Sequence, residues 1–124
     1  MPRSAGWMTN TILVGHAVGI NIVAGNTMTL EATLWGDGVW ANGADWKGAG
    51  AIITGTHNYR GDPAFVRPEA GDYHIGRRSA AIDRGVDTGV ASDIDGDPRP
   101  LGRGYDLGAD EYAARAIYLP LVLQ

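Results

Sequence analysis

Cysteine is absent from this 124-residue chain, so the chain has no disulfide framework and no thiol chemistry. This absence does not fix the cellular compartment. An excess of basic residues is also missing, because the formal net charge is −4 at pH 7. Phosphate binding needs a basic surface, so we expect no nucleic-acid partner. No apolar run reaches the ~18 residues of a membrane helix, and we therefore expect no transmembrane span.

Catalytic signatures are equally scarce. The sequence contains no GxSxG elbow, no P-loop and no dinucleotide-binding fingerprint. His16, His57 and His74 stand in unlike contexts without metal-ligand spacing, and each is expected to be a turn or packing residue. Glycan-cleaving enzymes need clustered carboxylates, but Glu31 and Asp45 do not recur in register. We therefore find no catalytic constellation in the sequence.

Glycine and apolar residues are plentiful. The chain has 19 glycines and six prolines, and 44% of its residues are hydrophobic, which argues against disorder and favours many short strands in one domain or part of one. Charge is uneven along the chain. Three acids and three bases precede Asp62, whereas eleven acids and seven bases follow from Asp62 onward. The first half is therefore expected to be packed and the second half to be a solvated coat.

Short strand-like segments recur in the first half. They are Thr11–Val14, Val18–Ile22, Met28–Trp35, Gly50–Gly55 and Ala64–Val66. Thr11–Leu13 and Thr33–Trp35 are separated by about 22 residues, which is within the range of solenoid repeats. A coil of this kind buries its inward face only by stacking on its neighbours. We predict three to four short, imperfect coils, with a small antiparallel β-sandwich as the rival fold.

Four segments follow from this pattern. They are a flexible lead at residues 1–9, coils at 10–90, a turn-rich segment at 91–112 and an apolar tail at 113–124. The tail is expected either to cap the stack or to act as an attachment tail. The first coil should leave an open strand edge, because the lead is too short and polar to cover it. This edge predicts that the chain is a fragment of a longer solenoid or that it self-associates through its N-terminal coil.

Alternating aspartates mark the turn-rich segment. Asp93, Asp95 and Asp97 could converge on a calcium ion, which takes several oxygen ligands. The spacing is not that of an EF-hand loop. Pro98 occupies the position that needs glycine, and Gly104 occupies that of the bidentate glutamate. The alternative is that these carboxylates accept backbone N–H groups in turns and pair with the nearby arginines Arg84, Arg99 or Arg103.

The second half also resembles a known family. The segments GDPAFV (61–66), GDYHIGRRSAAIDRG (71–85), DIDGDPRP (93–100) and GYDLGADEY (104–112) are similar to the C-terminal part of bacterial secreted right-handed parallel β-helix proteins of the pectate-lyase-like, choice-of-anchor type. Ala80 replaces the proline that is usual in this pattern, which loosens one turn. The resemblance implies an all-β right-handed parallel β-helix and a secreted or cell-surface location.

Tryptophans are concentrated between the second and third predicted coils. The segment from Trp35 to Gly50 contains Trp35, Asp37, Trp40, Asp45 and Trp46. Indole rings beside carboxylates are suited to polysaccharide binding, because sugar rings stack on aromatic faces and hydroxyls bond to polar groups. The alternative is that the indoles fold back and cover the side of the stack.

These observations together predict a non-catalytic C-terminal β-helix module that is structural or carbohydrate-binding. The alternative is the non-catalytic tail of a polysaccharide lyase or glycoside hydrolase whose active coils lie upstream. No cofactor is expected, apart from calcium at the three aspartates.

Overall fold

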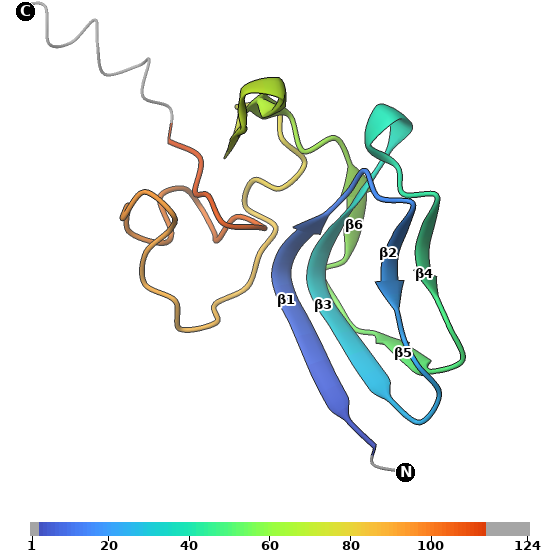
Figure 1. Ribbon diagram of the computed structural model, residues 1–124. Coiled ribbons are helices and arrows are strands. Elements are labelled where there is room, and N and C mark those ends of the chain that lie inside the picture. The colour runs from blue at the N-terminus through green and yellow to red at the C-terminus, as the bar shows by residue number, and fades with distance from the viewer. Residues whose placement is uncertain (1–2, 114–124) are drawn as a thin grey trace, which may run out of the picture.

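The computed structural model describes residues 3–113, and these form an almost purely β structure (Figure 1). The strands are β1 (Ala5–Leu13), β2 (Val18–Asn21), β3 (Thr27–Gly36), β4 (Ala44–Lys47), β5 (Ala51–Thr54), β6 (Tyr59–Gly61), β7 (Phe65–Arg67) and β8 (Asp72–Ile75). Two short 3₁₀ turns, η1 (Gly38–Trp40) and η2 (Pro68–Ala70), interrupt them. The all-β class expected from the sequence is confirmed.

Two parallel sheets form the first half. In the larger sheet β3 lies between β1 and β5, and β6 also pairs with β3, while β2 and β4 form the smaller sheet. The offset predicted between Thr11–Leu13 and Thr33–Trp35 is confirmed, because Thr11 pairs with Thr33 and Leu13 with Trp35. All these pairs are parallel, so the rival antiparallel sandwich is wrong.

A left-handed backbone corner recurs along the larger sheet. Asn10 has φ 49°, Ala32 has φ 52° and His57 has φ 60°. Asn10 and Ala32 are separated by the same offset that pairs β1 with β3, and His57 follows Ala32 by the offset that pairs Leu34 with Tyr59. Non-glycine residues rarely adopt positive φ, so its recurrence at matching positions shows that successive segments repeat one local geometry.

Asparagine side chains connect neighbouring segments at the turns. Asn42 accepts a hydrogen bond from the His16 backbone N–H at 2.8 Å and donates to the Leu13 carbonyl at 3.0 Å. Asn58 accepts from the Thr33 N–H at 3.0 Å and donates to the Leu30 carbonyl at 3.0 Å. Asn42 thus satisfies backbone groups at the end of β1, and Asn58 satisfies those on either side of the Ala32 corner within β3.

The buried apolar residues form two core clusters, and β3 contributes to both. Leu30, before the corner of β3, packs with Ile20 and Ile22 of the smaller sheet's side. Leu34, after the corner, packs with Leu107 and other residues of the second half. A strand without the corner would direct alternate residues such as these to one face. β3 therefore holds the parallel sheets and the C-terminal segment together.

The predicted flexible lead is wrong for residues 5–9. β1 begins at Ala5, which pairs with Thr27, and the Thr27 N–H donates to the Ser4 carbonyl at 2.9 Å. Residues 5–9 have only a weak local preference for a strand. They form one because the long strand β3 supplies a pairing partner along the whole segment.

The predicted coil at Ala64–Val66 is also wrong, and parallel pairing ends at Gly61 rather than near residue 90. β7 pairs antiparallel with β8. Between them η2 ends at Gly71 in the left-handed conformation with φ 79°, which reverses the chain. A tight reversal joins antiparallel strands, whereas a further parallel strand needs a longer crossover.

The turn-rich segment contains no named strand, as expected, and it lies on the side of β1 opposite β3 (Figure 1). The Gly108 N–H donates to the Asn10 carbonyl at 2.8 Å, and the Asn10 side chain donates to the Val86 carbonyl at 2.6 Å and accepts from the Val86 N–H at 2.8 Å. The edge expected to be open is therefore partly covered by the chain itself. Self-association through it remains a prediction.

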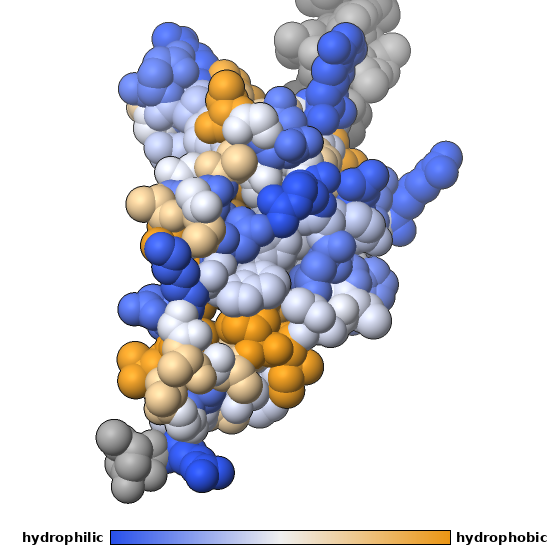
Figure 2. All heavy atoms as spheres, turned by 90° about the vertical axis from the view of Figure 1, so that its right-hand side faces the viewer, coloured by the Kyte–Doolittle hydropathy of each residue, from blue (hydrophilic) through white to orange (hydrophobic). Residues whose placement is uncertain are grey.

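Exposed apolar side chains remain around the parallel strands. Figure 2 shows such side chains gathered on the lower part of the face turned to the viewer. Trp7 of β1 is 70% exposed, and Ile53 of β5 is 52% exposed, so both outer strands of the larger sheet carry one. No helix within residues 3–113 is long and apolar enough to cross a membrane. The predicted apolar tail lies, apart from Ala113, outside the described residues.

Candidate functional site

The structure separates the three tryptophans that the sequence grouped as one binding platform. Trp35 is buried in the core cluster of Leu30, Ile20 and Ile22, and the centroid of its ring lies 5.5 Å from that of Trp46 in an edge-to-face arrangement. Trp40 points elsewhere and meets Phe65 edge to face at 5.3 Å. Trp35 and Trp46 therefore cover the parallel sheets, as the alternative interpretation of this loop expected, and Trp40 belongs to a different surface.

The two aspartates of the tryptophan loop have local partners. Asp37 accepts a hydrogen bond from the Gly38 N–H at 2.8 Å, which caps η1. Asp45 accepts from the Asn42 side chain at 3.0 Å and forms an ion pair with Arg60. These contacts assign both carboxylates to shaping the loop and its junction with β6.

Trp40 lines a cleft of about 740 Å³. One wall is the end of β1 and the turn after it, from Asn10 to His16. The opposite wall comes from the β7–β8 hairpin, with Phe65 and Tyr73, and the Gly108–Asp110 stretch completes the lining. Phe65 and Tyr73 meet edge to face at 5.1 Å, so three aromatic rings follow one another along the cleft. The sequence missed this site because its walls lie far apart in the chain.

The aspartate run forms a turn around Asp93. Its carboxylate accepts from the N–H groups of Asp95 at 2.9 Å, Asp97 at 3.0 Å and Glu111 at 2.8 Å. Burial opposes ionisation of Asp93, but these backbone donors hold the pKa of its carboxyl below the usual value. This geometry is what the turn-capping hypothesis expected of the run.

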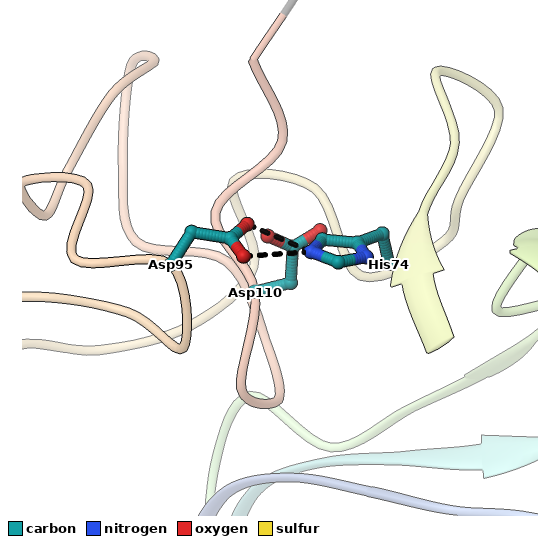
Figure 3. Close-up of side chains that lie close together, drawn as sticks. All are labelled: His74, Asp95 and Asp110. Carbon is teal, nitrogen blue, oxygen red and sulfur yellow. Dashed lines mark hydrogen bonds and ion pairs between the residues drawn. The ribbon is translucent and has the colours of Figure 1, made fainter. Parts of the chain in front are cut away.

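His74 joins the hairpin to the aspartate run (Figure 3). Its Nε2 lies 2.7 Å from the nearer carboxylate oxygen of Asp95, and its Nδ1 lies 2.5 Å from Asp72 on the same strand. Hydrogen bonds to Asp95 and then to Asp72 raise the pKa of His74 to about 9. His74 is therefore a cation at neutral pH, and not the packing residue that its sequence context indicated.

Asp110 lies beside this ion pair and also lines the cleft (Figure 3). Its side chain is buried and accepts from the Ile75 N–H at 2.9 Å. Burial, together with the neighbouring Asp93 carboxylate, raises the pKa of Asp110 to about 6. The folded state thus holds this proton more tightly than the unfolded chain, so the contribution of Asp110 to stability falls as the pH rises from about 3.8 through about 6.

Two overlapping sets of side chains could hold a metal ion. The ligand atoms of His74, Asp95 and Asp110 lie within 4.8 Å of one another, as do those of Asp93, Asp95 and Asp97. The second set offers the oxygen ligands that calcium prefers, whereas a set with imidazole suits a transition metal. Asp95 already binds His74, and Asp93 already accepts backbone N–H groups. A cation would have to replace those contacts. The geometry favours an ion-paired turn.

We expect the His74 ion pair to make stability fall with rising pH. The pKa of His74 is raised on folding, so its contribution is complete below about pH 6.5 and is lost as the pH rises through about 9. Melting temperatures measured between pH 6 and pH 10 should fall more steeply for the native chain than for His74→Gln. Because the imidazole is partly exposed, solvent screening keeps the effect modest. Parallel profiles for the two proteins would contradict this assignment.

Buried carboxylates correct the prediction that the second half is a solvated coat. Asp106, Asp110 and Glu111 are all almost fully buried. Arg99 extends into this group, and its Nη1 lies 3.1 Å from a Glu111 oxygen, whereas the sequence prediction paired an arginine with the aspartate run. Charged residues can be buried when they are paired and hydrogen-bonded, and composition alone does not reveal this.

Comparisons of the chain with protein-family models, with curated proteins and with solved structures found no match. The geometry described above is therefore the basis for the function proposed below.

Proposed function

We propose that this chain is a non-catalytic end module of a right-handed parallel β-helix, with a structural role in a secreted or cell-surface protein. One observation carries the proposal. The chain passes alternately through the larger and the smaller sheet, and each pass pairs in parallel with the pass before it. The offset along the chain is similar for every pair and falls within the range of solenoid repeats.

The recurring corner supports the same proposal. Left-handed residues at Asn10, Ala32 and His57 bend successive segments at matching positions. Stacked repeats of one supersecondary unit have this property, and each repeat buries its inward face only against its neighbours. Three passes through the larger sheet, at β1, β3 and β5–β6, are near the minimum of about three for a stable stack.

The role of the second half within this proposal is to cover the stack. Leu107 and Ala81 bury the apolar faces of Leu34 and Ala32, and no strand of the described segment continues the parallel sheets beyond β6. The secreted or cell-surface setting rests on the family resemblance of residues 61–112. The tail of a polysaccharide-degrading enzyme remains the alternative for the longer protein.

Engineered disulfides test the parallel register. Thr29 pairs directly with Ile53, and Trp7 pairs with Thr29 on the other side. Neighbouring strands lie about 4.8 Å apart, which suits a disulfide. The native chain has no cysteine, so any disulfide comes from the substitutions. The Thr29→Cys/Ile53→Cys variant should oxidise within one chain to near completion, as measured by peptide mapping without reductant.

The matched control is Trp7→Cys/Ile53→Cys. These positions lie two strands apart, about 9.6 Å, which is too far for a disulfide without backbone movement. Efficient cross-linking of this control, or failure of the Thr29–Ile53 pair in folded protein, would rule out the stacked register.

A further inference from the structure

We propose that the cleft between β1 and the β7–β8 hairpin is a binding site for a neutral glycan. The site is lined by the aromatic rings of Trp40, Phe65 and Tyr73 and by the Asn10–His16 segment. It goes beyond the structural role proposed above and does not depend on that role. It also replaces the platform of three tryptophans that the sequence indicated.

The size and position of the cleft suit a small ligand. Its volume of about 740 Å³ falls within the ~300–1,000 Å³ range that is typical of ligand sites. Its walls come from two elements that are held together, because Ile12 of β1 packs against the core cluster that contains Ile75 of β8. A cleft with walls fixed in this way is formed before the ligand arrives, which lowers the entropic cost of binding.

The aromatic rings supply the apolar part of the site. Trp40, Phe65 and Tyr73 stand successively edge to face, with interplanar angles of 86° and 88°. Tyr73, at the end of this series, is 55% exposed. An exposed ring at a cleft offers a face on which the C–H groups of a pyranose can pack.

The same residues supply polar groups that the protein does not use. Within residues 3–113, the Trp40 indole N–H, the Tyr73 hydroxyl and the His16 imidazole form no hydrogen bond. The Trp40 indole can donate a hydrogen bond, and the Tyr73 hydroxyl and the His16 imidazole can each donate or accept one. A ligand that combines apolar ring faces with hydroxyls that donate and accept fits this set, and a purely apolar ligand would leave it unpaired.

Charge indicates a neutral glycan. Among the lining residues Asp110 is the only aspartate or glutamate, and none is lysine or arginine. Asp95 and Asp93 lie next to Asp110, and the cation beside them, His74, is paired with Asp95. Recognition of a carboxylate or phosphate normally uses arginine or lysine, and carboxylates here would repel an anionic ligand. Polyuronates are therefore expected to bind more weakly than neutral oligosaccharides.

Isothermal titration calorimetry with defined oligosaccharides tests the proposal. The panel contains neutral tetrasaccharides of glucose, xylose and mannose, together with tetragalacturonate at the same concentrations. At least one neutral member should bind saturably, and tetragalacturonate should bind at least tenfold more weakly. Tyr73→Ala should weaken binding of that neutral member about tenfold, because the stacking surface is lost. His16→Ala should weaken it too, and it serves as the second variant if Tyr73→Ala fails to fold.

Trp7→Ala is the matched control. Trp7 is a more exposed aromatic residue on β1, outside the cleft lining, so its loss should leave the affinity unchanged. The proposal is overturned if no neutral oligosaccharide binds, if tetragalacturonate binds as tightly, or if Trp7→Ala weakens binding as much as Tyr73→Ala does. The cross-linking result at Thr29 and Ile53 is independent of all three outcomes, so a failure of this site can be told apart from a failure of the proposed fold role.

Discussion

Leu107→Asp is expected to detach the turn-rich segment from the parallel sheets. Leu107 is fully buried beside Leu34, Ile75 and Ala81, and its N–H donates to the Ala81 carbonyl at 2.9 Å. The substitution removes a buried leucine and places an unpaired carboxylate in the same space. Truncation of a buried leucine alone costs about 2–5 kcal/mol, so we expect the free energy of unfolding to fall by about 4 kcal/mol or more.

Urea unfolding followed by circular dichroism measures this loss, and binding of a hydrophobic dye reports the exposed core. Leu101→Asp is the control, because Leu101 belongs to the same segment but is 39% exposed. The control should unfold close to the native midpoint and bind little dye. Equal behaviour of the two variants would show that the segment does not cover the core through Leu107.

Glu111→Ala is expected to be the second large loss. The Glu111 side chain has no exposed surface, and that of Arg99 is 8% exposed. The carboxylate accepts from the Asp106 N–H at 2.8 Å as well as from Arg99 at 3.1 Å. Removing one partner leaves the other charge buried and uncompensated, which costs about 3–5 kcal/mol. Chemical unfolding at pH 7 should show a loss of this size.

Two comparisons isolate the cause. Glu69→Ala removes a carboxylate that pairs with Arg67 at 3.9 Å with both side chains well exposed, and it should leave stability unchanged. Arg99→Met/Glu111→Ala removes both buried charges and should recover part of the loss, because the remaining arginine is no longer stranded. A double variant that is no more stable than Glu111→Ala would contradict this explanation.

The sequence was sufficient for the offset that pairs β1 with β3. Apolar residues at Thr11–Leu13 and Thr33–Trp35 recur with one period, and stacking of like segments places them side by side. The strand at residues 5–9 was missed because its order comes from pairing with β3, which a local pattern does not record. Ala64–Val66 was assigned to a coil because a short strand has the same local pattern in a parallel or an antiparallel pair.

The candidate site could be predicted only in part. Composition drew attention to Trp40 and to Asp93, but Trp40 packs against Phe65 and Asp93 also accepts from Glu111, which is 18 residues away. His74 and Asp95 are 21 residues apart, and Asn10 and Val86 are 76 apart. Such contacts depend on how the C-terminal segment folds back, and no local spacing encodes that path. The sequence around Asp110, which lies in the turn-rich segment, did not indicate the burial that raises the pKa of this residue.

The central claim is that successive passes of the chain stack in parallel in both sheets at once. A variant with four cysteines tests it directly, combining Thr29→Cys/Ile53→Cys in the larger sheet with Val18→Cys/Ala44→Cys in the smaller one, where Val18 pairs with Ala44. Peptide mapping after mild oxidation should find both of these disulfides within the same monomer and no exchanged pairs. Absence of either bond in folded protein, or pairing between the two sheets, would contradict the stacked architecture.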